Sequence, residues 1–504
     1  MYSMSIFSFL ILGLLSLAKI NGEEAKNYTG KCNEIYEYLE GQGKTKNLVK
    51  CEGNDKGEVT ELIIYPYCLE NEQLKTILSY NTIETLSYRS EWSYVNNEES
   101  LKANFGCITV PTDYEVIGTL TNLKNLYVSG IVYTNTNIFS NIPKSVEKLN
   151  IKGNFSEYFK LTQKAIDGIS KLTNLNSLSL ECTEIGKRLD FSKFKNLKKF
   201  TSLNLIESSS YDLGNLFKNC NYLKQLEIDY NYDSIDEKFL DTIGYLTTLE
   251  ELDFFGAEFE DDASFSSLKK LKNLTTLSIN CPALYLKNKL SPNLFSLTKL
   301  KSFSLTNCGT SFSDPPSESL SWANLKNLEY LTLIDLEQKY YDLSERSLIF
   351  NLTYLGDLPS LKEVHIEYTG YSSLPENIGN LKNLEVLELP SNAIETLPKS
   401  IGELENLRSI YLYNNELTSL PDEIGNLKNL EELSLITNNI SSLPKSIGNL
   451  ENLRVLYMPF NDLTSLPDEI GNLKNLEVLD VSGNKITSLP ESVEKLKNLK
   501  EKSY

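Results

Sequence analysis

The chain has 504 residues, a formal net charge of −19, one histidine and eight cysteines. This length allows two or three ordinary domains or one long repeat array. The acidic balance argues against nucleic acid and anionic membranes as main partners, whereas it allows a cationic one.

Residues 1–22 are predicted to be a secretory signal peptide. The apolar run Ile6–Leu17 is too short to span a bilayer with ease, and small Gly22 precedes the expected cleavage site. No basic residue precedes the run, so an uncleaved anchor is the alternative. No later stretch is apolar enough to be transmembrane. We therefore expect a chain that is secreted or held at the cell surface, with no membrane span once mature.

Residues 23–100 are expected to form an N-terminal cap and weak first repeats, with candidate strands at 59–64 and 83–88. Four cysteines cluster in or next to this region, and in a secreted chain they suggest two disulfides with three possible pairings. The favoured pairs are Cys32 with Cys51 and Cys68 with Cys107. Cys281 and Cys308 occupy nearly equivalent places on adjacent coils and could also pair. In a cytosolic chain all of them would be reduced.

Leucine-rich phrases recur from about residue 101 to the end. Residues 101–370 carry them at irregular spacings of 23 to 33 residues, and residues 371–504 carry them every 23 residues. The longer repeats leave room for short helices, for instance around 234–246 and 341–356. The regular repeats open with a leucine and carry a recurrent asparagine; these leucines are Leu384, Leu407, Leu430, Leu453 and Leu476, and the asparagines are Asn392, Asn415, Asn438, Asn461 and Asn484.

Each regular repeat combines two periods. The L-x-L phrase has period two and predicts a short strand, whereas I-x-x-L-x-x-L has period three and suits extended or 3₁₀ turns. Proline after leucine suits the outer edge of a turn. The asparagine amide can satisfy buried turn backbone, where unpaired groups would be costly. One coil cannot bury its leucines alone, so stacked coils must supply the core.

These phrases resemble the leucine-rich repeat family, and residues 374–499 are similar to the 23-residue class of Ras-pathway scaffolds and plant Ras-group proteins. The resemblance implies an α/β solenoid, with a parallel sheet on the concave face and short helices, 3₁₀ turns and loops on the convex face. It also implies binding on the concave face. Proteins of that class are usually cytosolic, which departs from the predicted signal peptide.

Charges alternate in sign between successive regular repeats. Three columns of equivalent positions show this: Glu385, Arg408, Glu431, Arg454 and Glu477; Glu376, Lys399, Asp422, Lys445 and Asp468; and Lys382, Glu405, Lys428, Glu451 and Lys474. Stacked coils would bring each charge between two opposite ones. Duplication of a 46-residue unit, with charges carried passively, is the other explanation.

Two groups of outward strand positions are candidate binding residues. The first is aromatic and apolar: Tyr411, Tyr413, Ile436, Tyr457 and Phe460. Ser434 between Tyr411 and Tyr457 predicts a notch walled by aromatic rings. Such a notch suits an anchoring side chain of a protein partner, and a glycan is the alternative ligand. The second is acidic and favours a cationic partner for the middle repeats: Glu227, Asp229, Glu250, Glu251 and Asp253. Abundant tyrosine in strands and an ordinary solvated acidic face are the simpler explanations.

Catalysis and metal binding find no support in the motifs. His365 is the only histidine, is expected to face the concave surface, and cannot build a metal site alone. We expect no enzyme activity, no cofactor and no metal. Five sequons are glycosylation candidates if the chain is secreted: Asn27, Asn154, Asn273, Asn351 and Asn439. The sequence thus predicts a secreted, non-catalytic binding protein that recognises a protein partner through its concave face. An intracellular Ras-group scaffold and a glycan-binding protein are the alternatives.

Overall fold

The computed structural model divides into two compact units, residues 1–128 and 129–504. It describes residues 28–89, 114–129, 138–152, 159–181, 183–185, 189–194, 196–204, 217–218, 220, 222–229, 234–256, 258–259, 265–281, 289–290, 292–307, 311–312, 322–334 and 352–504. The predicted signal peptide, three of the sequons (Asn27, Asn154, Asn351) and three cysteines (Cys107, Cys182, Cys308) lie outside these ranges.

The first unit begins as a cap of one helix against a hairpin. Its elements are α2 (Gly30–Gly41), η1 (Thr45–Asn47), β1 (Leu48–Gly53), β2 (Val59–Ile64), α3 (Asn71–Ile77), β3 (Thr85–Arg89), α5 (Glu115–Gly118) and β4 (Asn125–Ser129), where η denotes a 3₁₀ helix and β4 ends at the first residue of the second unit. Strand β1 pairs antiparallel with β2, and β2 pairs parallel with β3. The two strands expected at 59–64 and 83–88 are thereby confirmed.

A disulfide fastens this cap. Cys32 on α2 is bonded to Cys51 on β1, with 5.6 Å between their Cα atoms, so the favoured first pair is confirmed. Cys68 and Cys281 each take part in a disulfide as well. The predicted partner of Cys68 is Cys107 and that of Cys281 is Cys308, and both of these lie outside the described residues.

The irregular part of the second unit alternates short strands with helices. Its elements are α6 (Ile138–Asn141), β5 (Lys148–Lys152), β6 (Phe159–Leu161), α7 (Gln163–Ile169), β7 (Ser177–Glu181), β8 (Thr183–Ile185), β9 (Lys199–Asn204), β10 (Gln225–Asp229), β11 (Ser234–Ile235), α9 (Glu237–Ile243), β12 (Glu251–Phe255), β13 (Glu258–Phe259), η2 (Ser266–Lys270), β14 (Thr276–Asn280), β15 (Lys289–Leu290), η3 (Pro292–Ser296), β16 (Ser302–Thr306), β17 (Ser311–Phe312), η4 (Trp322–Asn324), β18 (Tyr330–Ile334), η6 (Leu352–Asp357) and β19 (Glu363–Glu367). Helix α9 confirms the helix expected around 234–246.

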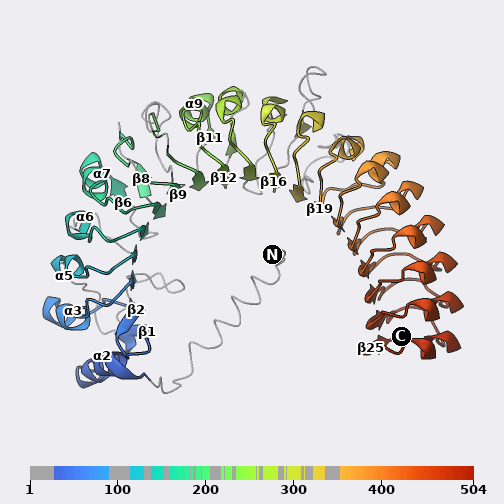
Figure 1. Ribbon diagram of the computed structural model, residues 1–504, viewed down its shortest axis with the longest axis horizontal. Helices are drawn as coiled ribbons and strands as arrows, with labels where there is room; N and C mark the ends of the chain where they lie inside the picture. Colours follow the sequence, from blue (N-terminus) through green and yellow to red (C-terminus); the bar gives the residue numbers. More distant parts are fainter. Residues whose placement is uncertain are drawn as a thin grey trace. The chain divides into compact units, whose positions relative to one another are not determined.

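The regular part repeats one strand and one 3₁₀ helix per coil. Its elements are η7 (Glu376–Asn380), β20 (Val386–Glu388), η8 (Lys399–Glu403), β21 (Ser409–Tyr411), η9 (Asp422–Asn426), β22 (Glu432–Ser434), η10 (Lys445–Asn449), β23 (Val455–Tyr457), η11 (Asp468–Asn472), β24 (Val478–Asp480), η12 (Glu491–Lys495) and β25 (Glu501–Ser503). From β10 to β25, each repeat contributes one strand to the main sheet, and successive strands of this sheet pair in parallel. Figure 1 shows these strands along the inner side of this unit and the 3₁₀ helices on its outer side.

The core of each coil is built by the spaced leucines and isoleucines. In the coil that opens at Leu407, the strand contributes Ile410, the residue just after it is Leu412, and the return leg contributes Leu417 and Ile424; all five are fully buried. Burial of one such side chain contributes about 1.5–3 kcal/mol. The two periods therefore become two layers, a strand in front and a 3₁₀ helix behind, with leucines between them.

The recurrent asparagine joins neighbouring coils through the turn backbone. The Asn438 side-chain amide donates to the carbonyl of Leu412 in the preceding coil at 2.8 Å and to that of Leu435 in its own coil at 3.2 Å, while its oxygen accepts from the Leu417 amide at 3.0 Å. Asn415 and Asn461 repeat the same set. The predicted role of this asparagine is confirmed.

Close stacking of the outer 3₁₀ helices depends on glycine. A Cβ atom added at Gly425 would lie 2.4 Å from the carbonyl oxygen of Ser446 in the next coil, and one added at Gly448 would lie 2.4 Å from that of Glu469. Because these neighbours are backbone atoms, they cannot simply turn away. The glycine of each "IGN" or "IGE" phrase therefore sets the spacing of the coils on their outer side.

Candidate binding surface

The outward face of the sheet carries one continuous row of cross-strand neighbours. His365 on β19 lies opposite Glu388 on β20, Glu388 opposite Tyr411, Tyr411 opposite Ser434, and Ser434 opposite Tyr457 on β23. The side chains of Val364 and Ile366, on either side of His365, are fully buried. His365 therefore faces outward, as the period-two pattern predicts.

The aromatic candidates gather over β21, β22 and β23. Tyr411 and Tyr457 end their strands, whereas Tyr413 and Ile436 lie two residues beyond the strand ends, where the inter-coil ladder continues through the bonds from Ser391 to Tyr413 and from Asn414 to Ile436. Ser434 between Tyr411 and Tyr457 is only 5% exposed, as expected for a small residue at the floor of a narrow gap between two larger ones. The notch stays a prediction.

Phe460 has an unusual backbone for a bulky residue. Its φ is 58°, in the left-handed region that costs an L-residue about 1–2 kcal/mol, and its side chain is 63% exposed. The equivalent position of the next coil is Gly483, and a Cβ there would lie 2.7 Å from the Phe460 ring. The ring thus lies over Gly483. The left-handed conformation itself belongs to the repeat, because Tyr368, Ser391, Asn414 and Thr437 adopt it at the equivalent positions.

Two tyrosines of this surface lie among carboxylates. The Tyr411 hydroxyl donates a hydrogen bond to Glu432, and burial together with that carboxylate raises the Tyr411 pKa to about 12. Burial also raises the Tyr413 pKa to about 12, and Glu367 and Glu388 add to the shift. The phenol groups are therefore neutral hydrogen-bond donors at physiological pH.

His365 is held between two carboxylates. Its Nε2 atom lies 3.2 Å from Oε2 of Glu367, and its Nδ1 atom lies 3.3 Å from Oε2 of Glu388. Burial raises the pKa of the Glu388 carboxyl, the imidazole opposes this rise, and Glu363 and Glu367 add to it. Among the described residues no group of three or more His, Cys, Asp or Glu side chains has the arrangement of a metal site. The sequence did not single out Glu363, Glu367 and Glu388, because only the register brings them together.

The outward face carries neither lysine nor arginine over a long stretch. Along the repeat-bearing strands from β10 to β25, no lysine or arginine occupies an outward position, although lysines and arginines are frequent elsewhere in these coils. The described outward carboxylates are Glu227, Glu251, Asp253, Glu363, Glu367, Glu388, Glu432, Asp480 and Glu501. The face therefore presents one sign of charge, with aromatic rings among the carboxylates.

The acidic candidates of the middle repeats fall into different places. Glu227 and Asp253 are direct neighbours on β10 and β12, and burial raises the Asp253 pKa. Glu251 is exposed at the start of β12. Glu250 precedes β12 and forms an ion pair with Lys224, and its role in binding stays a prediction. Asp229 is the last residue of β10, and the structure describes its backbone but not its side chain.

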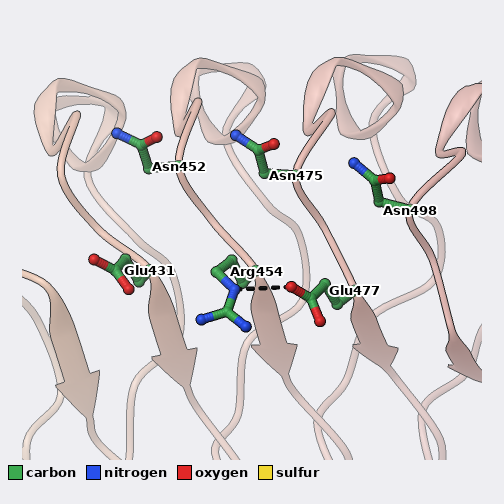
Figure 2. A pocket seen from close by; sticks show the side chains of 6 residues that line it. All are labelled: Glu431, Asn452, Arg454, Asn475, Glu477 and Asn498. Carbon is green, nitrogen blue, oxygen red and sulfur yellow. Dashed lines mark hydrogen bonds and ion pairs between the residues drawn. The ribbon is translucent and has the colours of Figure 1, made fainter.

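A polar groove follows the flank of the last coils. Figure 2 shows it, with a row of asparagines above a row of charged side chains; its volume is about 200 Å³, and it is lined by Glu431, Asn452, Arg454, Asn475, Glu477 and Asn498. The asparagines donate to carbonyls of preceding coils, as Asn475 does to Glu451 at 2.8 Å. Arg454 donates to Glu477 at 2.8 Å. These groups hold neighbouring coils together, so the groove is explained without a ligand.

Only one of the three predicted charge columns pairs as expected. Arg408 bonds Glu431, and Arg454 bonds Glu477. In the second column Lys399 reaches Glu423, one position past Asp422. In the third column Lys428 donates to the carbonyl of Asn449 rather than to a carboxylate. Long lysine side chains on the outer side thus find nearer acceptors than their register partners.

Two of the glycosylation candidates lie in described parts of the chain. Asn439 is exposed beside the buried Asn438. Asn273 is also exposed, and its amide donates to the carbonyl of Thr247 in the preceding coil at 3.1 Å. Glycosylation of Asn273 would therefore involve a nitrogen that already joins two coils. The use of either site stays a prediction.

Comparison with known proteins identifies the repeat. The family described as leucine-rich repeat region matches residues 310–464 and 445–501. Residues 310–501 thus consist of leucine-rich repeats. The regular part of the chain shows one period of 23 residues, and the match does not assign it to the Ras-group class. A comparison with curated protein sequences found no match.

Two solved structures show the same leucine-rich repeat fold. A leucine-rich repeat protein of Leptospira interrogans is 26% identical, with a TM-score of 0.55, over 86% of this chain and 99% of that one. A structure of the Toll–Spatzle complex of Drosophila has a TM-score of 0.63 at 15% identity, over 88% of this chain and 60% of that one. The α/β solenoid predicted from the repeats is confirmed. Within the described part of the chain, no helix is both long and apolar enough to cross a membrane.

Proposed function

We propose that this leucine-rich repeat protein is a secreted or extracellular, non-catalytic binding protein. It recognises a cationic protein partner through the outward sheet face between β10 and β25. The observation that carries this proposal is that one face combines carboxylates and aromatic rings with neither lysine nor arginine. Complementary charge steers partners into contact, and aromatic side chains supply much of the contact energy.

Phe460 gives the proposal independent support. The equivalent positions of the other regular coils hold Tyr368, Ser391, Asn414, Thr437 and Gly483 in the same left-handed conformation, so the fold itself imposes it. What Phe460 adds is an exposed ring, which is consistent with a contact to another molecule. The nearby Tyr411, Tyr413 and Tyr457 extend the same apolar surface.

The disulfides support an extracellular location. Cys32 and Cys51 are bonded, and such bonds persist in oxidising compartments and are rare in the cytosol. An intracellular scaffold of the Ras-group type would contain these cysteines as free thiols. The test of location is the native protein itself: N-terminal sequencing should begin after residue 22, and intact mass should show the disulfides. A retained Met1 with free thiols would reject extracellular placement.

The test of binding compares two baits in the native extracellular fraction. The full chain should capture a protein that the Tyr411→Ala, Tyr457→Ala variant captures poorly, with a loss of about 2 kcal/mol or more if these rings are anchors. The control is Tyr245→Ala, because Tyr245 is an exposed tyrosine that follows α9 on the outer side. Equal capture by wild type and the double variant would reject the face as the binding site.

A glycan is the second candidate ligand, because rings next to hydrogen-bonding carboxylates also suit a sugar. Enzymatic removal of glycans from the captured material separates the two. Capture that persists after deglycosylation supports a protein partner, and capture that disappears supports the glycan.

A further inference from the structure

Two exposed asparagines that carry the glycosylation signal have different surroundings in the fold. Asn273, followed by Leu274 and Thr275, lies on the flank where asparagines join neighbouring coils. Its Nδ2 atom donates to the Thr247 carbonyl at 3.1 Å, and its Oδ1 atom accepts from Nζ of Lys299 at 3.2 Å. Both polar atoms of this side chain therefore hold three successive coils together.

Asn439 presents its side-chain amide at a well-fixed place on the surface. The preceding residue, Asn438, is buried and bonds the backbone of two coils, and the backbone amide of Asn439 itself donates to the Leu417 carbonyl at 2.9 Å. The Asn439 side chain is exposed, and it forms no hydrogen bond with any described residue. This amide can therefore carry a substituent without the loss of a contact between coils.

The surface around Asn439 leaves room for a large group. The equivalent residue of the preceding coil is the exposed Glu416, and that of the following coil is Asp462, which is held by Lys485 at 2.7 Å. Asn439 stays exposed between them. Small hydroxyl residues follow on all three coils and are exposed as well: Thr418, Ser419, Ser441, Ser442, Thr464 and Ser465. A sugar attached here would therefore lie against short polar side chains.

N-glycosylation needs an asparagine amide and a hydroxyl two residues later, which Ser441 supplies for Asn439. The donor is a lipid-linked oligosaccharide diphosphate. The bond between C1 of its first sugar and the diphosphate oxygen breaks, C1 bonds Nδ2 of the asparagine, the lipid diphosphate leaves, and Nδ2 loses one proton. The attached group is bulky and belongs on the surface. At Asn273 it would crowd the bond to Thr247, whereas at Asn439 it replaces a hydrogen that no described residue accepts.

We propose that Asn439 is an N-glycosylation site of the folded protein and that Asn273 stays unmodified. This proposal rests on the extracellular location proposed above, because the donor belongs to the secretory pathway. The sequence signal is the same at both asparagines. The structure separates them, because only one of the two amides already joins neighbouring coils.

The first test expresses the full chain in a eukaryotic secretory host and collects the protein from the medium. Peptide N-glycosidase in heavy-oxygen water converts each glycosylated asparagine into a labelled aspartate, which mass spectrometry locates. We expect the label at Asn439 in most molecules and no label at Asn273. Secreted protein without label at Asn439, or with label at Asn273, would overturn the proposal.

Two adjacent serines provide a matched pair of variants for the signal itself. Ser441→Ala removes the hydroxyl that the transfer requires and should abolish the label at Asn439. Ser442→Ala changes the next residue, which is also exposed, and should leave the label unchanged. If the label disappears from both variants or persists in both, it does not depend on this signal, and the assignment of Asn439 fails.

The second test examines the structural reason for choosing Asn439. After glycosidase treatment, Asn273→Ala should unfold at a lower temperature than wild type, because the bonds to Thr247 and Lys299 are lost. Asn439→Ala should unfold at the wild-type temperature. Equal unfolding temperatures for the two variants would mean that the Asn273 amide does not hold the coils together, and the argument for selective use would fail.

The location and the glycosylation fail in distinguishable ways. A chain that stays inside the cells with Met1 retained and no label would reject both proposals. A chain that is secreted with its N-terminus after residue 22, but carries no label at Asn439, would leave the extracellular location standing and reject the glycosylation alone.

Discussion

Arg408 and Glu431 occupy the same position in successive coils, and Nη1 of Arg408 donates to Oε1 of Glu431 at 2.7 Å. The backbone fixes this relationship, because the amide of Glu431 donates to the carbonyl of Arg408 at 2.8 Å. The same backbone bond recurs at every step of a longer column: Lys301, Glu329, Lys362, Glu385, Arg408, Glu431, Arg454, Glu477 and Lys500. Signs alternate along the whole column.

This column separates the two explanations of the charge alternation. Duplication of a 46-residue unit accounts for the regular repeats only, whereas the alternation continues where 33 residues separate Glu329 from Lys362. Lys301 and Lys362 both hold Glu329 there. Pairing between neighbouring coils therefore accounts for the pattern over a length that duplication does not cover.

Glu477 gives this pairing a pH signature. Lys500 and then Arg454 hydrogen-bond its carboxylate and lower its pKa from 4.5 to about 2. A lowered pKa in the folded state means that its stabilisation is present above the ordinary value and is lost as pH falls through the lower one. We therefore expect wild type to lose more thermal stability than Glu477→Gln between pH 4.5 and pH 2. Parallel melting curves for the two proteins across this range would contradict the assignment.

The buried asparagine ladder predicts a large difference between adjacent residues. Asn438→Ala removes the bonds to the backbone of Leu412, Leu417 and Leu435 and leaves buried polar groups unpaired. We expect a loss of about 2–4 kcal/mol in free energy of unfolding. Asn439→Ala, at the exposed neighbour, should change it by less than about 0.5 kcal/mol. Urea denaturation of both variants measures the contrast, and similar losses would show that the ladder adds little.

Gly425→Ala tests the spacing of the outer 3₁₀ helices. The added methyl would meet the Ser446 carbonyl oxygen at 2.4 Å, so the coils must move apart. Such overpacking costs about 1–3 kcal/mol. Gly41→Ala is the matched control, since a Cβ at Gly41 meets nothing within 4 Å. If Gly425→Ala and Gly41→Ala both unfold at the same temperature as wild type, glycine does not set the spacing of the coils.

The Cys32–Cys51 disulfide should stabilise mainly the first unit. The bond closes a loop with a sequence separation of 19 residues, for which the chain-entropy effect is about 3 kcal/mol. The Cys32→Ser, Cys51→Ser variant should show faster proteolysis within residues 28–89 and unchanged protection of residues 352–504. Cleavage at the same rate in both regions would mean that the bond does not act locally.

The sequence predicts the solenoid well because its signals are local and repeated. Each coil needs spaced leucines for its core, a buried asparagine for its turn and a 3₁₀ phrase for its return leg. Leu407, Asn415 and Ile424 show the burial expected from these signals. Contacts between coils are harder to foresee. Lys399 pairs with Glu423 rather than Asp422 because side-chain length decides among near neighbours.

The cluster around His365 escaped sequence reasoning for a related reason. Glu363, Glu367 and Glu388 come from two coils at the junction between irregular and regular spacing, where the sequence leaves the register open. The structure supplies that register. A search of the sequence for outward strand positions without lysine or arginine would have pointed to the same face.

The most direct test of partner binding on the outward face is an oxidative footprint of the full chain with and without the captured partner. Hydroxyl radicals modify exposed rings, and mass spectrometry reports each site. We predict that partner binding protects Tyr411, Tyr413, Tyr457 and Phe460, while oxidation of Tyr245 on the outer side stays unchanged. Protection of Tyr245 with undiminished oxidation of Phe460 and the three tyrosines would contradict binding on this face.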